Sequence, residues 1–138
     1  MQKQLYNRTS TKVGVLTIKL VNRDTGQLIA GDVQSAYSFW KRLKGLMFVK
    51  SLPDDLAMHI APCSSIHTFF MKSRIDILYL NDKYEIVGME ENLASGKIGK
   101  RFSKVRSVVE LPAGKIKTSA VNVGQAVDFV RREHEEVI

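Results

Sequence analysis

The sequence predicts a β-rich α+β fold, in which a single compact, antiparallel, barrel-like sheet is accompanied by one or two short helices. Short runs of β-branched and apolar residues recur along the chain, turn residues separate them, and only one segment has clear helical spacing. The length of 138 residues suits one domain, and neither a repeat nor a linker interrupts the chain. We therefore expect a single domain over residues 1–138, with residues 1–12 loosely ordered.

The first predicted elements form a hairpin. Residues 13–22 are rich in β-branched side chains and predict a strand, and the Asp-Thr-Gly sequence at 24–26 supplies the turn that ends it. Residues 27–33 are expected to return as the partner strand.

The next segment is the one clear helix prediction. Between residues 35 and 43, Tyr37, Trp40 and Leu43 are three residues apart and form an apolar stripe. Gly45 is placed to stop this helix, because glycine accepts the left-handed conformation in which helices often end.

The middle of the chain predicts further strands. Residues 56–60 and 65–71 are strand-like, and Pro62 between them excludes a central strand position for that corner, because proline cannot donate to a sheet. The clearest hairpin joins residues 76–80 to residues 85–90 through an Asn-Asp-Lys turn.

The C-terminal third is less uniform. Residues 94–101 predict a mobile loop, and residues 105–111 predict a strand that the Pro-Ala-Gly turn at 112–114 ends. Two interpretations of the tail stay open. Residues 121–129 alternate like a strand, whereas residues 125–136 lack helix breakers and suit a helix.

The composition excludes several classes of protein. One cysteine excludes an internal disulfide scaffold, and no apolar run is long enough to span a bilayer. Residues 1–8 are not followed by an apolar segment, so we expect that they are not a signal peptide. We therefore expect a cytoplasmic protein with no membrane partner.

The chain is basic, with 21 Lys+Arg against 14 Asp+Glu and a net charge of +7. This charge favours polyanionic partners, and a cluster near the predicted mobile loop predicts binding of nucleic acid or another polyanion, with Phe102 placed to stack on a base. The cations of this cluster are Lys97, Lys100, Arg101, Lys104 and Arg106. A solvated basic surface without a partner is the alternative.

Rare residues crowd together in residues 63–76, which hold the single cysteine, Cys63, and three further chemically active side chains, His67, Met71 and Asp76. A hydrolase-type enzyme could use Cys63 with His67, because an imidazole can generate a thiolate. Residues four apart on a strand are separated by about 13 Å, however, which weakens this pair. A small buried thiol and a core histidine are the alternative.

Two other kinds of site are alternatives for residues in and near this segment. A hydrolase could instead use Asp76 with Glu110 as paired carboxylates. The soft side chains His59, Cys63, His67 and Met71 suit copper or zinc, but no two of them have the close spacing of a metal motif. We therefore predict neither a metal nor another cofactor.

Several motifs in order resemble the family called domain of unknown function 192. They are Gly-Leu-Met at 45–47, His-Thr-Phe-Phe-Met-Lys at 67–72 with Ile-Asp at 75–76, Val-Glu-Leu-Pro-Ala-Gly at 109–114, and Val-Gly at 123–124. The resemblance covers about residues 30–130 and implies a β-rich, barrel-like domain whose biochemical role is not established. Gln125 stands where the family usually has aspartate, and residues 93–106 lack the proline that relatives often carry.

The resemblance also implies that these motifs line one end of the domain. Glu110 lies between Val109 and Leu111, so strand alternation turns its side chain away from theirs. We expect a small binding or accessory protein with an unknown ligand, polyanion binding and hydrolysis being the alternatives. The residues expected to line its pocket are Gly45, Met47, His67, Met71, Asp76, Glu110 and Gly114.

Overall fold

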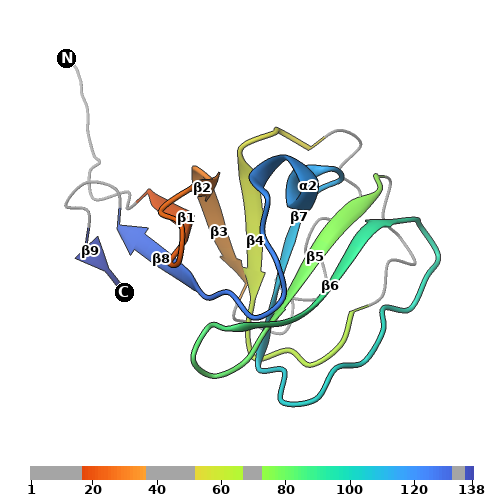
Figure 1. Ribbon diagram of the computed structural model, residues 1–138. Coiled ribbons are helices and arrows are strands. Elements are labelled where there is room, and N and C mark those ends of the chain that lie inside the picture. The colour runs from red at the N-terminus through yellow and green to blue at the C-terminus, as the bar shows by residue number, and fades with distance from the viewer. Residues whose placement is uncertain (1–16, 37–51, 67–72, 132–135) are drawn as a thin grey trace.

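The computed structural model describes residues 17–36, 52–66, 73–131 and 136–138, and these residues form two β-sheets and one short helix (Figure 1). One sheet has the strand order β2-β1-β8-β9 and the other has the order β3-β4-β7-β5-β6. The elements are β1 (Ile18–Asn22), β2 (Leu28–Ala30), β3 (Asp32–Ala36), β4 (Leu56–Ile60), β5 (Ile75–Leu80), β6 (Ile86–Leu93), β7 (Ser107–Pro112), α2 (Lys115–Ser119), β8 (Val127–Arg131) and β9 (Glu136–Val137).

The β-rich α+β class and both predicted hairpins are confirmed. Strand β1 pairs antiparallel with β2, and β5 pairs antiparallel with β6. The turn between β5 and β6 is built by Asn81, whose Oδ1 accepts hydrogen bonds from the backbone N–H groups of Lys83 and Glu85, both at 2.9 Å. An asparagine that bonds its own backbone two residues on is what turn chemistry predicts.

The sheet differs from the prediction in three respects. The strands form two sheets that do not close into a barrel, and β3 and β4 are parallel rather than antiparallel. Ser35 and Ala36 belong to β3, so the helix expected from residue 35 does not begin there; its remainder lies outside the described residues.

Gly31 explains how the chain changes sheets. It is the single residue between β2 and β3, and its backbone N–H donates to Asp55 Oδ1 at 2.6 Å. A Cβ at this position would lie 2.7 Å from the same oxygen, so a larger residue would require the Asp55 carboxylate to move away. The chain leaves one sheet at this bend and enters the other.

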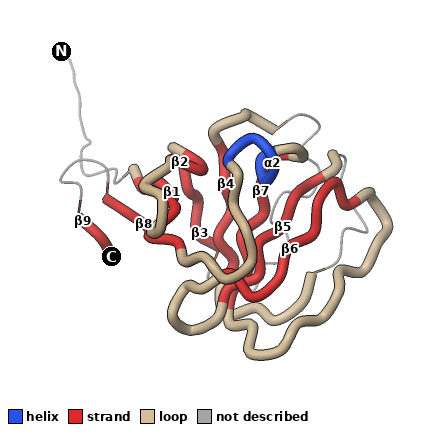
Figure 2. Tube along the Cα trace, in the orientation of Figure 1, coloured by secondary structure: helices blue, strands red, loops and turns tan. Residues whose placement is uncertain are grey.

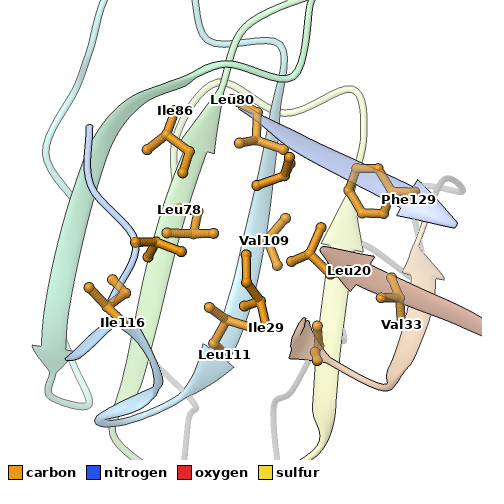
Figure 3. Close-up of a cluster of buried hydrophobic side chains, with 14 residues drawn as sticks. Leu20, Ile29, Val33, Leu78, Leu80, Ile86, Val109, Leu111, Ile116 and Phe129 are labelled. Atoms are coloured by element: carbon orange, nitrogen blue, oxygen red, sulfur yellow. The ribbon is translucent and has the colours of Figure 1, made fainter. Parts of the chain in front are cut away.

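The main core lies between the two sheets (Figure 3). Leu78, Leu80 and Val109 of the five-stranded sheet face Leu20 and Phe129 of the four-stranded sheet. The opposite face of the five-stranded sheet is also buried, which explains why all six residues of β5 are inaccessible to solvent. Alternate side chains of that strand therefore enter two different apolar clusters.

The C-terminal part contains a helix that the sequence did not predict. Helix α2 follows β7 directly, and its residue Ile116 packs into the main core (Figures 2 and 3). The strand interpretation of the tail is confirmed over β8, and residues 132–135 lie outside the described part. In the described part of the chain, no helix has the length and apolar character needed to cross a membrane.

Candidate functional site

Asp76 anchors the beginning of α2. Its Oδ2 accepts hydrogen bonds from the backbone N–H groups of Gly114 at 3.0 Å and Ile116 at 2.9 Å, and its Oδ1 accepts one from Asn92 at 2.8 Å. The side chain is fully buried. A carboxylate can satisfy the unpaired N–H groups of a helix start as a capping residue does, and this one comes from a strand far along the chain. Asp76 therefore has a structural role in the described geometry.

The structure separates the two carboxylates that were considered as a catalytic pair. Asp76 is paired with Leu111 across the sheet, whereas Glu110 is paired with Ile77. Paired residues of antiparallel strands share a face, and successive residues lie on opposite faces. Asp76 therefore faces α2, and Glu110 faces the other side of the sheet.

Only part of the predicted pocket can be placed. Asp76 and Gly114 are brought together by their hydrogen bond, and Glu110 lies on the opposite face. Gly114 has a φ of 93°, the left-handed conformation that glycine favours. The other predicted members, Gly45, Met47, His67 and Met71, lie outside the described residues, and that pocket stays a prediction.

Glu110 shares its face of the sheet with a buried tyrosine. The hydroxyl of Tyr79 donates a hydrogen bond to Glu90 Oε1 at 2.6 Å. Burial, followed by this bond to Glu90, raises the pKa of Tyr79 far above its ordinary value, so the phenol keeps its proton. This pair was not predicted from the sequence, although Glu90 lies two residues beyond Gly88, the partner of Tyr79 in the predicted hairpin.

The same glutamate fixes the loop that follows β6. Glu90 Oε1 accepts a second hydrogen bond from the backbone N–H of Lys100 at 2.9 Å, and the N–H of Gly99 donates to the carbonyl of Ile66 at 2.8 Å. Gly99 is buried, and a Cβ there would lie 2.7 Å from Ile66 Cγ2. The sequence predicts a mobile loop here, but these hydrogen bonds hold the centre of the loop against the sheet.

A cleft of about 370 Å³ opens at the other end of the five-stranded sheet from α2. Strands β4 and β5 end there and β7 begins there (Figure 1). Its lining residues are His59, Ala61, Pro62, Asn81, Asp82, Tyr84, Arg106 and Ser107. Turns are predicted from the sequence at several of these positions, but nothing in the sequence indicates that these turns meet.

His59 forms the inner wall of the cleft. Its ring stacks on Phe129 with centroids 4.2 Å apart and meets Tyr84 edge-on at 5.9 Å. Burial lowers the pKa of His59 to about 4, so the imidazole is neutral near pH 7. The cleft is therefore closed on this side by aromatic rings without charge.

Arg106 and Ser107 supply the polar part of the cleft. The hydroxyl of Ser107 is buried and has no hydrogen-bond partner among the described residues. Arg106 is exposed, and within the described ranges its guanidinium makes neither a hydrogen bond nor an ion pair with a side chain. Buried hydroxyls are nearly always hydrogen-bonded, so the state of Ser107 needs an explanation.

The predicted polyanion-binding cations are all exposed and lie on the loop between β6 and β7. Phe102, however, does not present its ring for stacking on a base. The ring packs on Tyr79 with centroids 4.7 Å apart and fills the space beside Gly88, where a Cβ would collide with it. One of the reasons for expecting nucleic acid is therefore removed.

Cys63 is half-buried, and its Sγ donates a hydrogen bond to the backbone carbonyl of Ser65 at 2.9 Å. Its expected partner in catalysis, His67, lies outside the described residues. Within the described ranges, no three His, Cys, Asp or Glu side chains are grouped as metal ligands would be.

Comparison with known proteins gives a consistent result. Residues 20–129 match the family described as uncharacterized ACR, domain of unknown function 192. The UPF0127 protein of Thermococcus kodakarensis is 29% identical over 122 residues, covering 85% of this chain and 76% of that protein. The UPF0127 protein of Pyrococcus furiosus is 30% identical over 117 residues, covering 81% of this chain and 98% of that protein.

Two crystal structures share the fold. A putative transcription regulator from Sinorhizobium meliloti has a TM-score of 0.68 and 22% identity, covering 83% of this chain and 92% of its own. A protein of unknown function from Novosphingobium aromaticivorans has a TM-score of 0.70 and 15% identity, covering 80% of this chain and 82% of its own. At these identities the likeness concerns the fold alone.

Proposed function

The chain belongs to the family called domain of unknown function 192, whose members have no established activity, and we propose that it is a binding domain that holds a small organic anion in the cleft between His59 and Arg106. The proposal rests on the shape, polarity and unused hydrogen-bonding capacity of that cleft.

The cleft has the size and composition of a small-molecule site. Its volume of about 370 Å³ falls within the range of ligand pockets, which are mostly apolar and carry a few polar groups that fix orientation. Ala61, Pro62 and Tyr84 provide apolar surface, and the neutral ring of His59 adds to it. A ligand with an apolar body is favoured.

The hydroxyl of Ser107 is the observation that carries the proposal. A buried hydroxyl without a partner is unfavourable by about 1–3 kcal/mol, and a fold does not normally retain that cost. Ser107 lines the cleft, and a serine side chain can turn between staggered rotamers to bring Oγ toward a bound group. A ligand would supply the partner that the described residues do not.

Arg106 indicates that the ligand carries a negative charge. Its guanidinium offers a planar fork of donors that matches a carboxylate or phosphate, and Arg106 lines the cleft as does Ser107, its neighbour in the sequence. Asp82 also lines the cleft, but it is exposed in a turn, where water screens its charge. An acidic ligand group beside Arg106 and Ser107 is therefore favoured.

Titration of the isotope-labelled chain with citrate, benzoate and inorganic phosphate tests the proposal through amide chemical shifts. We expect shifts confined to the cleft, centred on residues 81–82 and 106–107. Arg106→Gln should weaken binding of the best probe about tenfold or more, because a charge-assisted bond is lost, whereas Lys104→Gln two residues away should not. Shifts spread over the basic surface, or equal loss in both variants, would replace site binding with general charge attraction.

A further inference from the structure

The loop between β6 and β7 carries the strongest concentration of positive charge in the described chain. Residues 94–106 contain no aspartate or glutamate, and all five of their cations are exposed. Within the described ranges, the side chains of Lys100, Arg101 and Lys104 form no ion pair. The charges of these three side chains are therefore presented to solvent without an ion-pair partner among the described residues.

An exposed hydrophobic residue lies in the middle of these charges. Ile98 is 72% exposed, more than any other large hydrophobic side chain in the described residues. It stands next to Lys97 and two positions before Lys100. A single exposed hydrophobic residue needs no explanation by itself, and it is the position of Ile98 among the cations that bears on the kind of partner.

The backbone holds this tip in place. The N–H groups of Gly99 and Lys100, directly after Ile98, bond to the carbonyl of Ile66 and to Glu90 Oε1. Gly99 is turned inward against Tyr79, while Ile98 and Lys100 on either side of it are exposed. Apolar and cationic side chains are thus displayed together on a segment whose backbone is held against the five-stranded sheet.

We propose that residues 97–106 form a docking surface for the anionic headgroups of a lipid bilayer, with Ile98 entering the interface between headgroups and acyl chains. Clusters of cations are attracted to anionic lipid, and an apolar side chain among them adds affinity only where there is an apolar layer to enter. This replaces the expectation of no membrane partner, which followed from the lack of a spanning segment. A surface contact needs no such segment.

The same observations disfavour a nucleic acid on this surface. Single strands are bound by cations together with aromatic rings on which bases stack. Phe102, the aromatic residue of this loop, is packed on Tyr79 and against Gly88. Phosphate contacts alone would also leave Ile98 without a partner.

Sedimentation of the full chain with lipid vesicles tests the proposal. One vesicle preparation is pure phosphatidylcholine and the other is an equimolar mixture of phosphatidylcholine and phosphatidylglycerol. We expect salt-sensitive binding to the mixed vesicles and none to the neutral ones. Reversing Lys100 and Arg101 to glutamate should lower the partition coefficient at least about 25-fold, from about fivefold for each cation.

The contribution of Ile98 is tested by a separate substitution with a matched control. Ile98→Ser should weaken binding to the mixed vesicles roughly tenfold without changing the charge. Val123→Ser removes another exposed hydrophobic side chain, 55% exposed, and should leave binding unchanged. Reversal of Lys83 and Lys117, exposed cations outside this loop, is the control for net charge, and circular dichroism confirms the fold of every variant.

Three outcomes would overturn the proposal. The first is equal binding to neutral and anionic vesicles, and the second is an Ile98→Ser variant that binds like the parent. The third is tight binding of a single-stranded oligonucleotide that depends on Lys100 and Arg101 while the mixed vesicles stay unbound, because it would make this a nucleic-acid surface. None of these results depends on the cleft, so the proposed function is tested separately.

Discussion

Replacing Asp76 by asparagine tests whether this carboxylate is a structural anchor. The substitution keeps the shape of the side chain and removes one of its two acceptor oxygens. In the native chain, Oδ2 accepts the N–H groups of Gly114 and Ile116, and Oδ1 accepts that of Asn92. An amide group must point its NH2 at one side or the other, so a donor then faces a donor in a fully buried position.

The expected cost follows from these three bonds. At least one of them is lost outright, and a hydrogen bond to a charged group contributes about 1.5–3 kcal/mol. The bonds that remain lose their charge assistance, which accounts for about half of their strength. We therefore expect the free energy of unfolding to fall by about 3–4 kcal/mol, a large part of the roughly 5–15 kcal/mol available to a domain of this kind.

Urea unfolding followed by circular dichroism measures this change. Asp54→Asn is the matched control, because the Asp54 side chain is 93% exposed and its 3.1 Å ion pair with Lys115 is a surface contact that contributes about 0–1 kcal/mol. A loss below about 1 kcal/mol for Asp76→Asn would refute the anchoring role. Unchanged binding of the best anionic probe by the folded fraction would agree with a position at the far end of the sheet from the cleft.

Three further predictions concern two residues of the cleft, His59 and Ser107, and the packing of Phe102 against Gly88. The pKa of His59 is lowered from 6.5 to about 4, so between these pH values the imidazole binds a proton in the unfolded chain but not in the folded one. The free energy of unfolding should therefore fall by up to about 3 kcal/mol as the pH drops from 6.5 to about 4. In His59→Phe, the urea midpoint should depend less on pH over this interval. Ser107→Ala should raise the unfolding free energy by about 1 kcal/mol while weakening binding of the best anionic probe; a clear loss of stability would show that the hydroxyl has a structural partner. Gly88→Ala should destabilise by about 1–3 kcal/mol because Phe102 occupies the space of the new Cβ, and the penalty should largely disappear in a Phe102→Ala background.

The hairpins were predictable because their information is local. The β1 and β5 segments are short and rich in β-branched or apolar residues, and each ends at a turn sequence whose side chains bond the nearby backbone. Asn22 Oδ1, for example, accepts the N–H of Asp24 at 2.9 Å in the first turn, as Asn81 does in the second. Such contacts span two residues, so the sequence alone contains both partners.

The division into two sheets and helix α2 were not predictable because their causes are distant in sequence. The bend at Gly31 depends on Asp55, and the start of α2 depends on Asp76, 38 residues before Gly114. Helix α2 has no side-chain cap of its own, so the signal that normally marks a helix start is missing. A parallel pairing such as that of β3 with β4 likewise has no local turn that could indicate it.

The candidate site was predicted only in fragments. Arg106 was identified as a cation, Asn81 and Asp82 as a turn, and Pro62 as a corner, each for a different reason. They meet because β4, β5 and β7 place two strand ends and one strand start at the same edge of the sheet. Antiparallel order, once known, brings such positions together, but the order β4-β7-β5 is not readable from the sequence.

The buried polar side chains of Asp76, Tyr79 and Ser107 differ in whether the described residues provide their hydrogen-bond partners. Asp76 is buried with both oxygens occupied by backbone donors, and the Tyr79 hydroxyl is bound to Glu90, so the fold itself accounts for both groups. Ser107 is buried, and the described residues offer its hydroxyl no hydrogen-bond partner. Buried hydroxyls are nearly always hydrogen-bonded, and this is why we propose that a ligand binds in the cleft rather than at the anchored carboxylate of the family-like motif.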